Sequence, residues 1–218
     1  MIVVVVMVLG CAPLHVQAAG FAPMRDTNTD GTNIFAMGDC RAVAIFSMCK
    51  HKGASISQGA GHYKGMWSGG YVIDSNAQMS LMKKAVVKNL KKKGKATVFI
   101  MATLNIGNAW RSKPAPAVKA QLRPAKIAAG WTAKYKDRVV KPTVYVTSLV
   151  PKSGTSAASY NNCLKKYLKK NAYRSLNYIQ RSAKGGFSGD GIHLSHSGAK
   201  AIWNTMRKAD KKTQIQYK

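Results

Sequence analysis

The chain has 218 residues and a hydrophobic content of 46%, which fits one globular domain and excludes an intrinsically disordered protein. Its 35 lysines and arginines stand against only 7 acids, all of them aspartates, so the formal net charge is +28. Such a surface attracts polyanions, and we expect it to bind anionic polymers of a cell wall, acidic polysaccharide or lipid headgroups. No zinc-finger spacing, RNP-like aromatic strand or heptad basic region is visible, so we do not expect specific nucleic-acid binding.

Residues 1–18 predict a signal peptide, because an apolar run from Ile2 to Leu9 precedes small residues that suit cleavage after Ala18. The run is too short to span a bilayer, and we expect no transmembrane segment in the mature chain. The mature protein is therefore expected to be secreted or associated with the cell envelope. The sequence Val8-Leu9-Gly10-Cys11 leaves open a lipoprotein acylated on Cys11.

Three cysteines remain after removal of the leader: Cys40, Cys49 and Cys163. An odd number in an exported protein leaves at least one free thiol. A Cys49–Cys163 disulfide with Cys40 free, and three reduced cysteines, are both compatible with the sequence.

We expect a linker at residues 19–32, one domain at 33–210 and a basic tail at 211–218. Within the domain, strand-like and helix-like segments alternate. Apolar or branched runs predict strands at 34–37, 54–57, 96–104, 143–149 and 176–179. Helical spacing predicts helices at 41–50, from Ser75 or Asn76 to Lys93, within 115–136, at 156–170 and at 195–208. The glycine-rich segment 59–70 is expected to be a loop. This alternation predicts an α/β fold with a parallel sheet covered by helices on both faces.

Functional groups of such sheets gather beyond the carboxyl ends of the strands. Directly after the first strand, Gly38-Asp39-Cys40-Arg41 would place a nucleophile on a sharp turn at a helix N-terminus. The helix end and Arg41 would both favour a Cys40 thiolate. The alternative is an inert small residue in a tight turn.

Two further segments could stabilise a developing oxyanion. Gly59, after the second strand, would let a backbone N–H approach a substrate oxygen closely, or it is simply part of a turn. Asn105, after the third strand, could donate its amide to the same oxygen, or cap the next turn. Asn108 is a competing candidate.

The last strand is followed by Asp190-Gly191-Ile192-His193. An aspartate at this spacing can hold the tautomer of the imidazole while the histidine takes a proton from a nucleophile. An isolated pair of this kind can also be a loop and capping feature.

These four features, in this order, resemble the Ser-Gly-Asn-His (SGNH, GDSL-type) hydrolase family over about residues 33–206, and especially its exported bacterial members with arginine after the nucleophile. Gly38-Asp39-Cys40 matches two of three positions of the Gly-Asp-Ser block, and the Asp-x-x-His block matches fully. The departures are Cys40 in place of serine, and Thr103 and Ile106 in the third block.

The resemblance implies a three-layer α/β/α fold with a flavodoxin-like five-stranded parallel sheet. It also implies cleavage or transfer of acyl esters through an acyl-enzyme, and we expect a carbohydrate or cell-envelope substrate. By position, Cys40 would attack, His193 would be the base and Asp190 would orient it, while Asp39 would shape the turn. The backbone N–H groups of Cys40 and Gly59 and the side chain of Asn105 would hold the oxyanion.

The rival hypothesis is a catalytically degenerate module of the same fold that binds anionic polymers. No metal is expected, because His51, His62, His193 and His196 lack a ligand spacing. No cofactor is expected either, because Gly59-Ala60-Gly61 lacks the rest of a dinucleotide motif.

Overall fold

The computed structural model describes residues 34–38, 41, 45, 55–56, 63–64, 71–73, 75–102, 109–184 and 186–215. The predicted leader and linker therefore lie outside the described residues. So does most of the predicted helix at 41–50, of which Arg41 and Ile45 are described as helical.

The centre of the fold is a parallel sheet. Strands β1 (Ile34–Met37), β5 (Thr97–Ile100), β8 (Thr143–Thr147) and β9 (Leu176–Ile179) run side by side, and β2 (Ser55–Ile56) pairs with the outer side of β1. The order in the sheet is β2-β1-β5-β8-β9, and every pairing is parallel. All residues of β1 and β5 are buried, as expected for strands covered on both faces. The α/β prediction is confirmed at this level.

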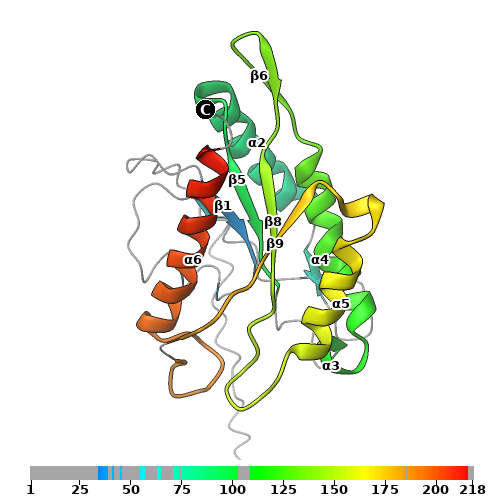
Figure 1. Cartoon of the computed structure of the whole chain (residues 1–218), viewed down its shortest axis with the longest axis vertical. Coiled ribbons are helices and arrows are strands. Elements are labelled where there is room, and N and C mark those ends of the chain that lie inside the picture. The colour runs from blue at the N-terminus through cyan, green and yellow to red at the C-terminus, as the bar shows by residue number, and fades with distance from the viewer. Residues whose placement is uncertain are drawn as a thin grey trace, which may run out of the picture.

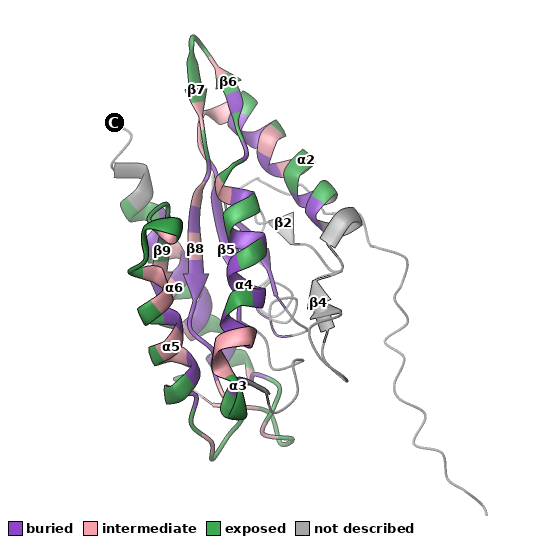
Figure 2. Ribbon diagram, turned by 90° about the vertical axis from the view of Figure 1, so that its right-hand side faces the viewer, coloured by how far each residue is buried: buried purple, intermediate pink, exposed green. Residues whose placement is uncertain are grey.

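Helices flank the sheet (Figure 1). Helices α2 (Ser75–Lys93), α4 (Pro114–Ala129) and α5 (Ala158–Leu168) contribute to one buried cluster, and α6 (His196–Ile215) contributes to the other. The short helix α3 (Ala109–Ser112) precedes α4, and a 3-10 turn, η1 (Asn171–Tyr173), follows α5. Figure 2 shows β5 buried along its length and β8 partly buried, with exposed residues on the outward sides of α4 and α5. No helix in this described part is long and apolar enough to cross a membrane.

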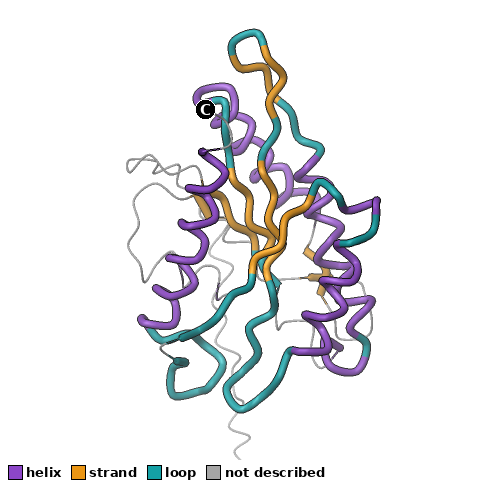
Figure 3. Tube along the Cα trace, viewed as in Figure 1, coloured by secondary structure: helices purple, strands orange, loops and turns teal. Residues whose placement is uncertain are grey.

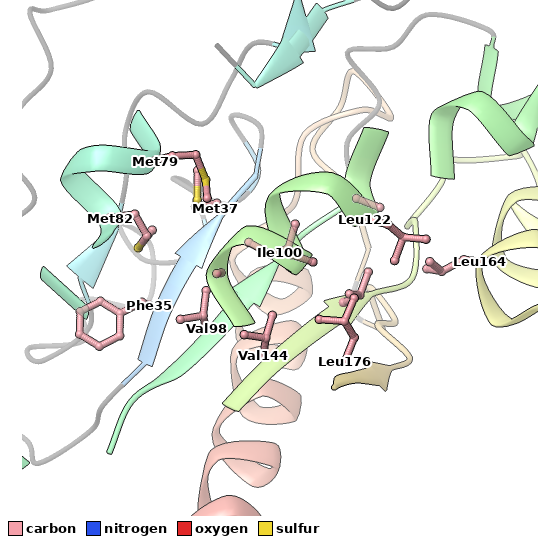
Figure 4. Close-up of a cluster of buried hydrophobic side chains, with 14 of the residues drawn as sticks. Phe35, Met37, Met79, Met82, Val98, Ile100, Leu122, Val144, Leu164 and Leu176 are labelled. Carbon is pink, nitrogen blue, oxygen red and sulfur yellow. The ribbon is translucent and has the colours of Figure 1, made fainter. Parts of the chain in front are cut away.

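Successive residues of each inner strand enter opposite clusters, which is the period of two of an extended chain. Phe35 and Val98 pack toward Met82 of α2 and Leu122 of α4 (Figure 4). Their neighbours in the chain point the other way. The second cluster joins strand residues to α6 and comprises, among others, Ile34, Ala36, Phe99, Ile202, Trp203 and Met206.

A buried side-chain amide on α4 forms hydrogen bonds with the carboxyl ends of two central strands. Gln121 is 2% exposed, and its Nε2 donates to the carbonyl oxygens of Ile100 at 3.0 Å and Thr147 at 2.9 Å. Its Oε1 accepts from the Tyr160 hydroxyl at 2.6 Å. Because buried polar groups are costly without partners, this network fixes the spacing of β5 and β8.

Two short antiparallel hairpins differ from the prediction. The region 115–136 was expected to be helical, but α4 ends at Ala129 and is followed by β6 (Ala133–Tyr135) and β7 (Arg138–Val140). Gly130 terminates the helix, and Lys136 has φ 51°, which only a tight turn tolerates. The segment 59–70 was expected to be a loop, yet β3 (Tyr63–Lys64) pairs with β4 (Tyr71–Ile73). Strands of two or three residues are too short to show a period of two.

Other boundaries shift by a few residues. The strand expected at 96–104 ends at Ile100, where Met101 still donates to the Met37 carbonyl oxygen at 2.7 Å. The helix expected at 195–208 continues to Ile215, into the segment predicted as a tail. Figure 3 shows the β6–β7 hairpin at one end of the molecule and the loops after β8 and β9 at the other.

Gly94 follows α2, which ends at Lys93 as predicted. It has φ +72°, and its N–H donates to the Leu90 carbonyl oxygen at 2.8 Å. A Cβ at this position would lie 2.5 Å from the Tyr135 ring, so the hairpin packs directly on the end of the helix. Gly154 has nearly the same φ, +70°, but a Cβ there would meet no atom within 4 Å.

Gly94→Ala is expected to lower the free energy of unfolding by about 2–4 kcal/mol, and Gly154→Ala by about 1 kcal/mol, as measured by urea denaturation. Both carry the cost of a positive φ, and only the first adds a clash with Tyr135. In a Tyr135→Ala background, Gly94→Ala should cost no more than Gly154→Ala. Equal costs in the unmodified background would contradict the packing of the hairpin on α2.

Candidate functional site

The loop between β9 and α6 carries both Asp190 and His193, in orange at the lower end of Figure 1. It is a closed turn, because Gly191 N–H donates to the Ser188 carbonyl oxygen at 2.9 Å and Ser188 N–H donates to the His193 carbonyl oxygen at 2.8 Å. Phe187 and Leu194 form an antiparallel bridge at its base. Gly191 has φ +65°, a conformation that favours glycine between the two polar residues.

The Asp190 carboxylate is held from several sides. Its Oδ2 contacts His193 Nδ1. Its Oδ1 accepts from the Ser188 hydroxyl at 2.7 Å and from the N–H groups of Ile192 and His193, both at 2.9 Å. The His193 contact, then the Ser188 hydroxyl and the two amides, hold the pKa of Asp190 far below its usual range. Asp190 is therefore an anion of fixed orientation at neutral pH.

This contact orients the His193 ring. With Nδ1 facing a carboxylate, the neutral imidazole carries its proton on Nδ1, and Nε2 becomes the basic nitrogen. The His193 side chain is 52% exposed, so the ring lies at the surface and not in the core. The next residue, Leu194, is 1% exposed and anchors the loop in the cluster of α6.

Hydrogen bonds at the start of α6 hold the end of this loop in place. Ser195 caps the helix, because its Oγ accepts from Gly198 N–H at 3.1 Å and donates to the Gly186 carbonyl oxygen at 3.0 Å. A Cβ on Gly198 would lie 2.3 Å from that carbonyl oxygen, so the close approach of loop and helix requires glycine. His196 lies in the first turn of α6, as predicted.

The other predicted site residues lie mostly outside the described residues. Cys40, Asp39, Gly59 and Asn105 belong to this group, as does the competing Asn108. Gly38 is described, buried, and follows the end of β1.

Arg41 is described and is 3% exposed. Its Nη1 donates to the Val150 carbonyl oxygen at 2.7 Å, in the segment that leaves β8. The guanidinium thus connects the residue after Cys40 to the carboxyl end of a strand elsewhere in the sheet. From the sequence, Arg41 was expected only to favour the Cys40 thiolate, and this contact was not predicted.

The loop after β8 also contacts the loop that carries the two polar residues. Ser153 N–H donates to the Gly191 carbonyl oxygen at 2.8 Å. The loop after β8 therefore accepts a side-chain hydrogen bond from Arg41, the residue after Cys40, and donates a backbone hydrogen bond to Gly191, which lies between Asp190 and His193.

Arg181 is a further residue that the sequence argument missed. It is 5% exposed, and its Nη2 donates to the carbonyl oxygens of Ala102 at 2.9 Å and Ser148 at 2.8 Å. Its Nε also donates to Ser148 O, at 2.9 Å. One side chain thus joins the carboxyl ends of β5, β8 and β9. An arginine two residues after the end of a predicted strand was the available signal.

Cys163 lies on α5, and the structure records its thiol as free. Partial burial raises the pKa of this thiol, and Lys166 and Lys170 offset part of the rise. Its predicted partner, Cys49, is outside the described residues. No group of three or more histidines, cysteines or aspartates that could hold a metal ion occurs among the residues that the structure describes.

No protein-family model matches the chain, and no curated protein or solved structure matches it either.

The ionised Asp190 carboxylate should make the free energy of unfolding depend on pH. Because the pKa of Asp190 is lower in the folded chain than the ordinary value near 3.9, the ionised carboxylate stabilises the fold fully above about pH 4, and this contribution is lost as the pH falls below that value. The difference in free energy of unfolding between wild type and Asp190→Asn should be constant at neutral pH and shrink between about pH 4 and pH 2. Urea denaturation of both proteins across this range measures it. If the free energies of unfolding of the two proteins changed in parallel with pH, the hydrogen bonds to the Asp190 carboxylate would be contradicted. Ser188→Ala, which removes one of these bonds, should reduce the loss of stability at low pH.

Proposed function

We propose that the chain is an exported acyl-ester hydrolase or acyltransferase of the SGNH type that acts on a carbohydrate or cell-envelope substrate. Cys40 is the nucleophile, His193 the general base and Asp190 the residue that orients it. The backbone N–H groups of Cys40 and Gly59 and the amide of Asn105 hold the oxyanion. The protein is secreted or associated with the cell envelope.

The observation that carries this proposal is the contact between Asp190 and His193 at the carboxyl edge of the sheet. The carboxylate receives three other hydrogen bonds and cannot turn away, so the imidazole keeps Nε2 as its basic nitrogen. A base of this kind on an exposed loop can accept a proton from a thiol or hydroxyl nucleophile.

The strand order supports the finer fold, a three-layer flavodoxin-like sheet of five strands. Numbered along the chain, the order β2-β1-β5-β8-β9 is 2-1-3-4-5, which is the doubly wound order with its topological switch point between the first and third strands. Ligands of such sheets bind beyond the carboxyl ends of the strands at that point. Cys40 follows β1, which is one of these two strands.

The contacts on either side of the loop after β8 support the meeting of nucleophile and base. Arg41, adjacent to Cys40 in the chain, reaches Val150, and Ser153 reaches Gly191 between the two polar residues. Leu194, adjacent to His193, is buried in the same cluster as residues of β1. Arg41, the residue after Cys40, and Gly191, between Asp190 and His193, are thus both bonded to the loop after β8.

The reaction follows from these roles. His193 Nε2 takes the proton of Cys40 Sγ, and the thiolate attacks the acyl carbonyl carbon to form a tetrahedral oxyanion. Collapse breaks the ester bond, and the alkoxide leaves with the proton from His193. A thioester remains. Water, or an acceptor hydroxyl in a transferase, then gives its proton to His193 and attacks the thioester. Collapse of this second intermediate breaks the bond between carbon and Sγ and releases the acyl product, and His193 returns the proton to Cys40 Sγ.

Hydrolysis of p-nitrophenyl acetate tests the proposal. His193→Ala and Cys40→Ala are each expected to lower kcat/KM by about 10²-fold or more, and Asp190→Asn by a smaller factor, because its loss affects only the orientation of the base. Cys40→Ser should keep measurable activity, since serine is the residue of the SGNH block. A wild-type rate no higher than that of Cys40→Ala would end the proposal.

Cys163 provides an internal control for the thiolate. Iodoacetamide labelling at graded pH, read by mass spectrometry, should modify Cys40 well below pH 8 and Cys163 only at higher pH, because burial raises the pKa of the Cys163 thiol. The labelling of Cys40 should shift to higher pH in His193→Ala.

A second candidate function, binding of anionic polymers by a catalytically degenerate module, is favoured by the surface of α2. Exposed lysines recur on one face of this helix at positions 84, 88, 91 and 92. Residues three and four apart are neighbours on a helix, and like charges there destabilise it. The helix contains no acid, so a bound polyanion would relieve this repulsion. Because α2 ends at the amino edge of the sheet, this lysine face lies away from Asp190 and His193.

Salt elution from a heparin column measures this binding. The triple variant Lys88→Gln/Lys91→Gln/Lys92→Gln should elute at clearly lower salt than wild type. The matched variant Lys119→Gln/Lys200→Gln/Lys208→Gln carries the same net charge and should elute closer to wild type. Identical elution of the two variants would mean that the total charge, and not the α2 face, determines binding.

A further inference from the structure

A groove of about 380 Å³ lies beyond the carboxyl ends of β8 and β9. One wall is the loop that leaves β8, around residues 149–157, and the other is the loop that leaves β9, around residues 180–187. Both loops are visible at the lower end of Figure 1. The volume suits one or two sugar units.

The lining has a distinct chemistry. Lys152 projects from one wall and Lys184 from the other, both exposed, and the buried Arg181 lies between the strand ends. Hydroxyl groups come from Ser153 and Ser182, and none of the described residues that line the groove is an acid. Two cations on facing walls favour a ligand with a negative charge, and the hydroxyl groups favour one with many hydrogen-bonding groups.

Each wall is bonded to the loop of Asp190 and His193. Ser153 N–H donates to the Gly191 carbonyl oxygen, and Phe187, which lines the other wall, forms a bridge with Leu194. The groove therefore lies next to the loop that carries the candidate catalytic pair.

We propose that this groove is a subsite for an anionic sugar unit of the acylated polymer, with its carboxylate or phosphate between Lys152 and Lys184. The inference rests on the proposed function for its link to catalysis, and it adds the substrate class: an ester on an acidic carbohydrate. Binding itself does not depend on Cys40.

Isothermal titration calorimetry at low salt tests the binding. The ligands are a uronic-acid tetrasaccharide, a sugar-phosphate oligomer of similar length, and a neutral tetrasaccharide. Lys152→Gln/Lys184→Gln should weaken binding of the preferred anionic ligand by about ten-fold. The variant Lys119→Gln/Lys208→Gln removes two exposed lysines of α4 and α6 outside the groove and should change it by less than about two-fold. The tighter of the two anionic ligands identifies the acidic group.

Equal losses in the two variants, or equally tight binding of the neutral ligand, would overturn the subsite. A second measurement separates this failure from failure of the proposed function. For wild type, the ratio of kcat/KM on an O-acetylated uronic-acid tetrasaccharide to that on p-nitrophenyl acetate should fall about ten-fold in Lys152→Gln/Lys184→Gln. If wild type cleaves neither ester but the groove variant still loses the ligand, the subsite stands and the hydrolase function fails. If both esters are cleaved with an unchanged ratio, the hydrolase function stands and the subsite fails.

Discussion

The candidate site depends on one carboxylate. Asp190 accepts hydrogen bonds from two backbone amides and a hydroxyl of its own loop, and its remaining oxygen faces His193. The turn around Gly191 and the Ser195 cap hold the loop against the start of α6. The imidazole can therefore lie on the protein surface and still have a defined orientation, which a base needs if it is to meet a nucleophile from another part of the chain.

The shortage of acids shapes the rest of the molecule. Several lysines lie over aromatic rings: Lys170 is 4.5 Å from the centroid of the Tyr167 ring and Lys165 is 5.3 Å from that of Tyr178. One further aspartate, Asp210, is 3% exposed and accepts a 2.7 Å hydrogen bond from Thr97. Exposed lysines lie on the face of α2, at positions 84, 88, 91 and 92, and on the rims of the groove, at positions 152 and 184.

Much of the fold could be predicted from the sequence, because its central strands are apolar on both faces and its helices have a clear period. The strands at 34–37 and 176–179 match the structure residue for residue, and α2 ends at Lys93 as expected. The hairpins were missed for a physical reason. Their strands are stabilised by packing, such as that of Tyr135 against Gly94, and they carry no periodic pattern of their own.

By itself the sequence determined the α/β class, the excess of positive charge, and the spacing of Asp190 and His193, since all three depend on residue types and short-range geometry. Only the tertiary structure decided which strands are neighbours, that Arg41 reaches Val150, and that Arg181 joins three strand ends. It also decided that two loops form a basic groove beside His193. These contacts join residues far apart in the chain, and their partners are mostly backbone carbonyl oxygens, which every residue has and which no sequence pattern can distinguish.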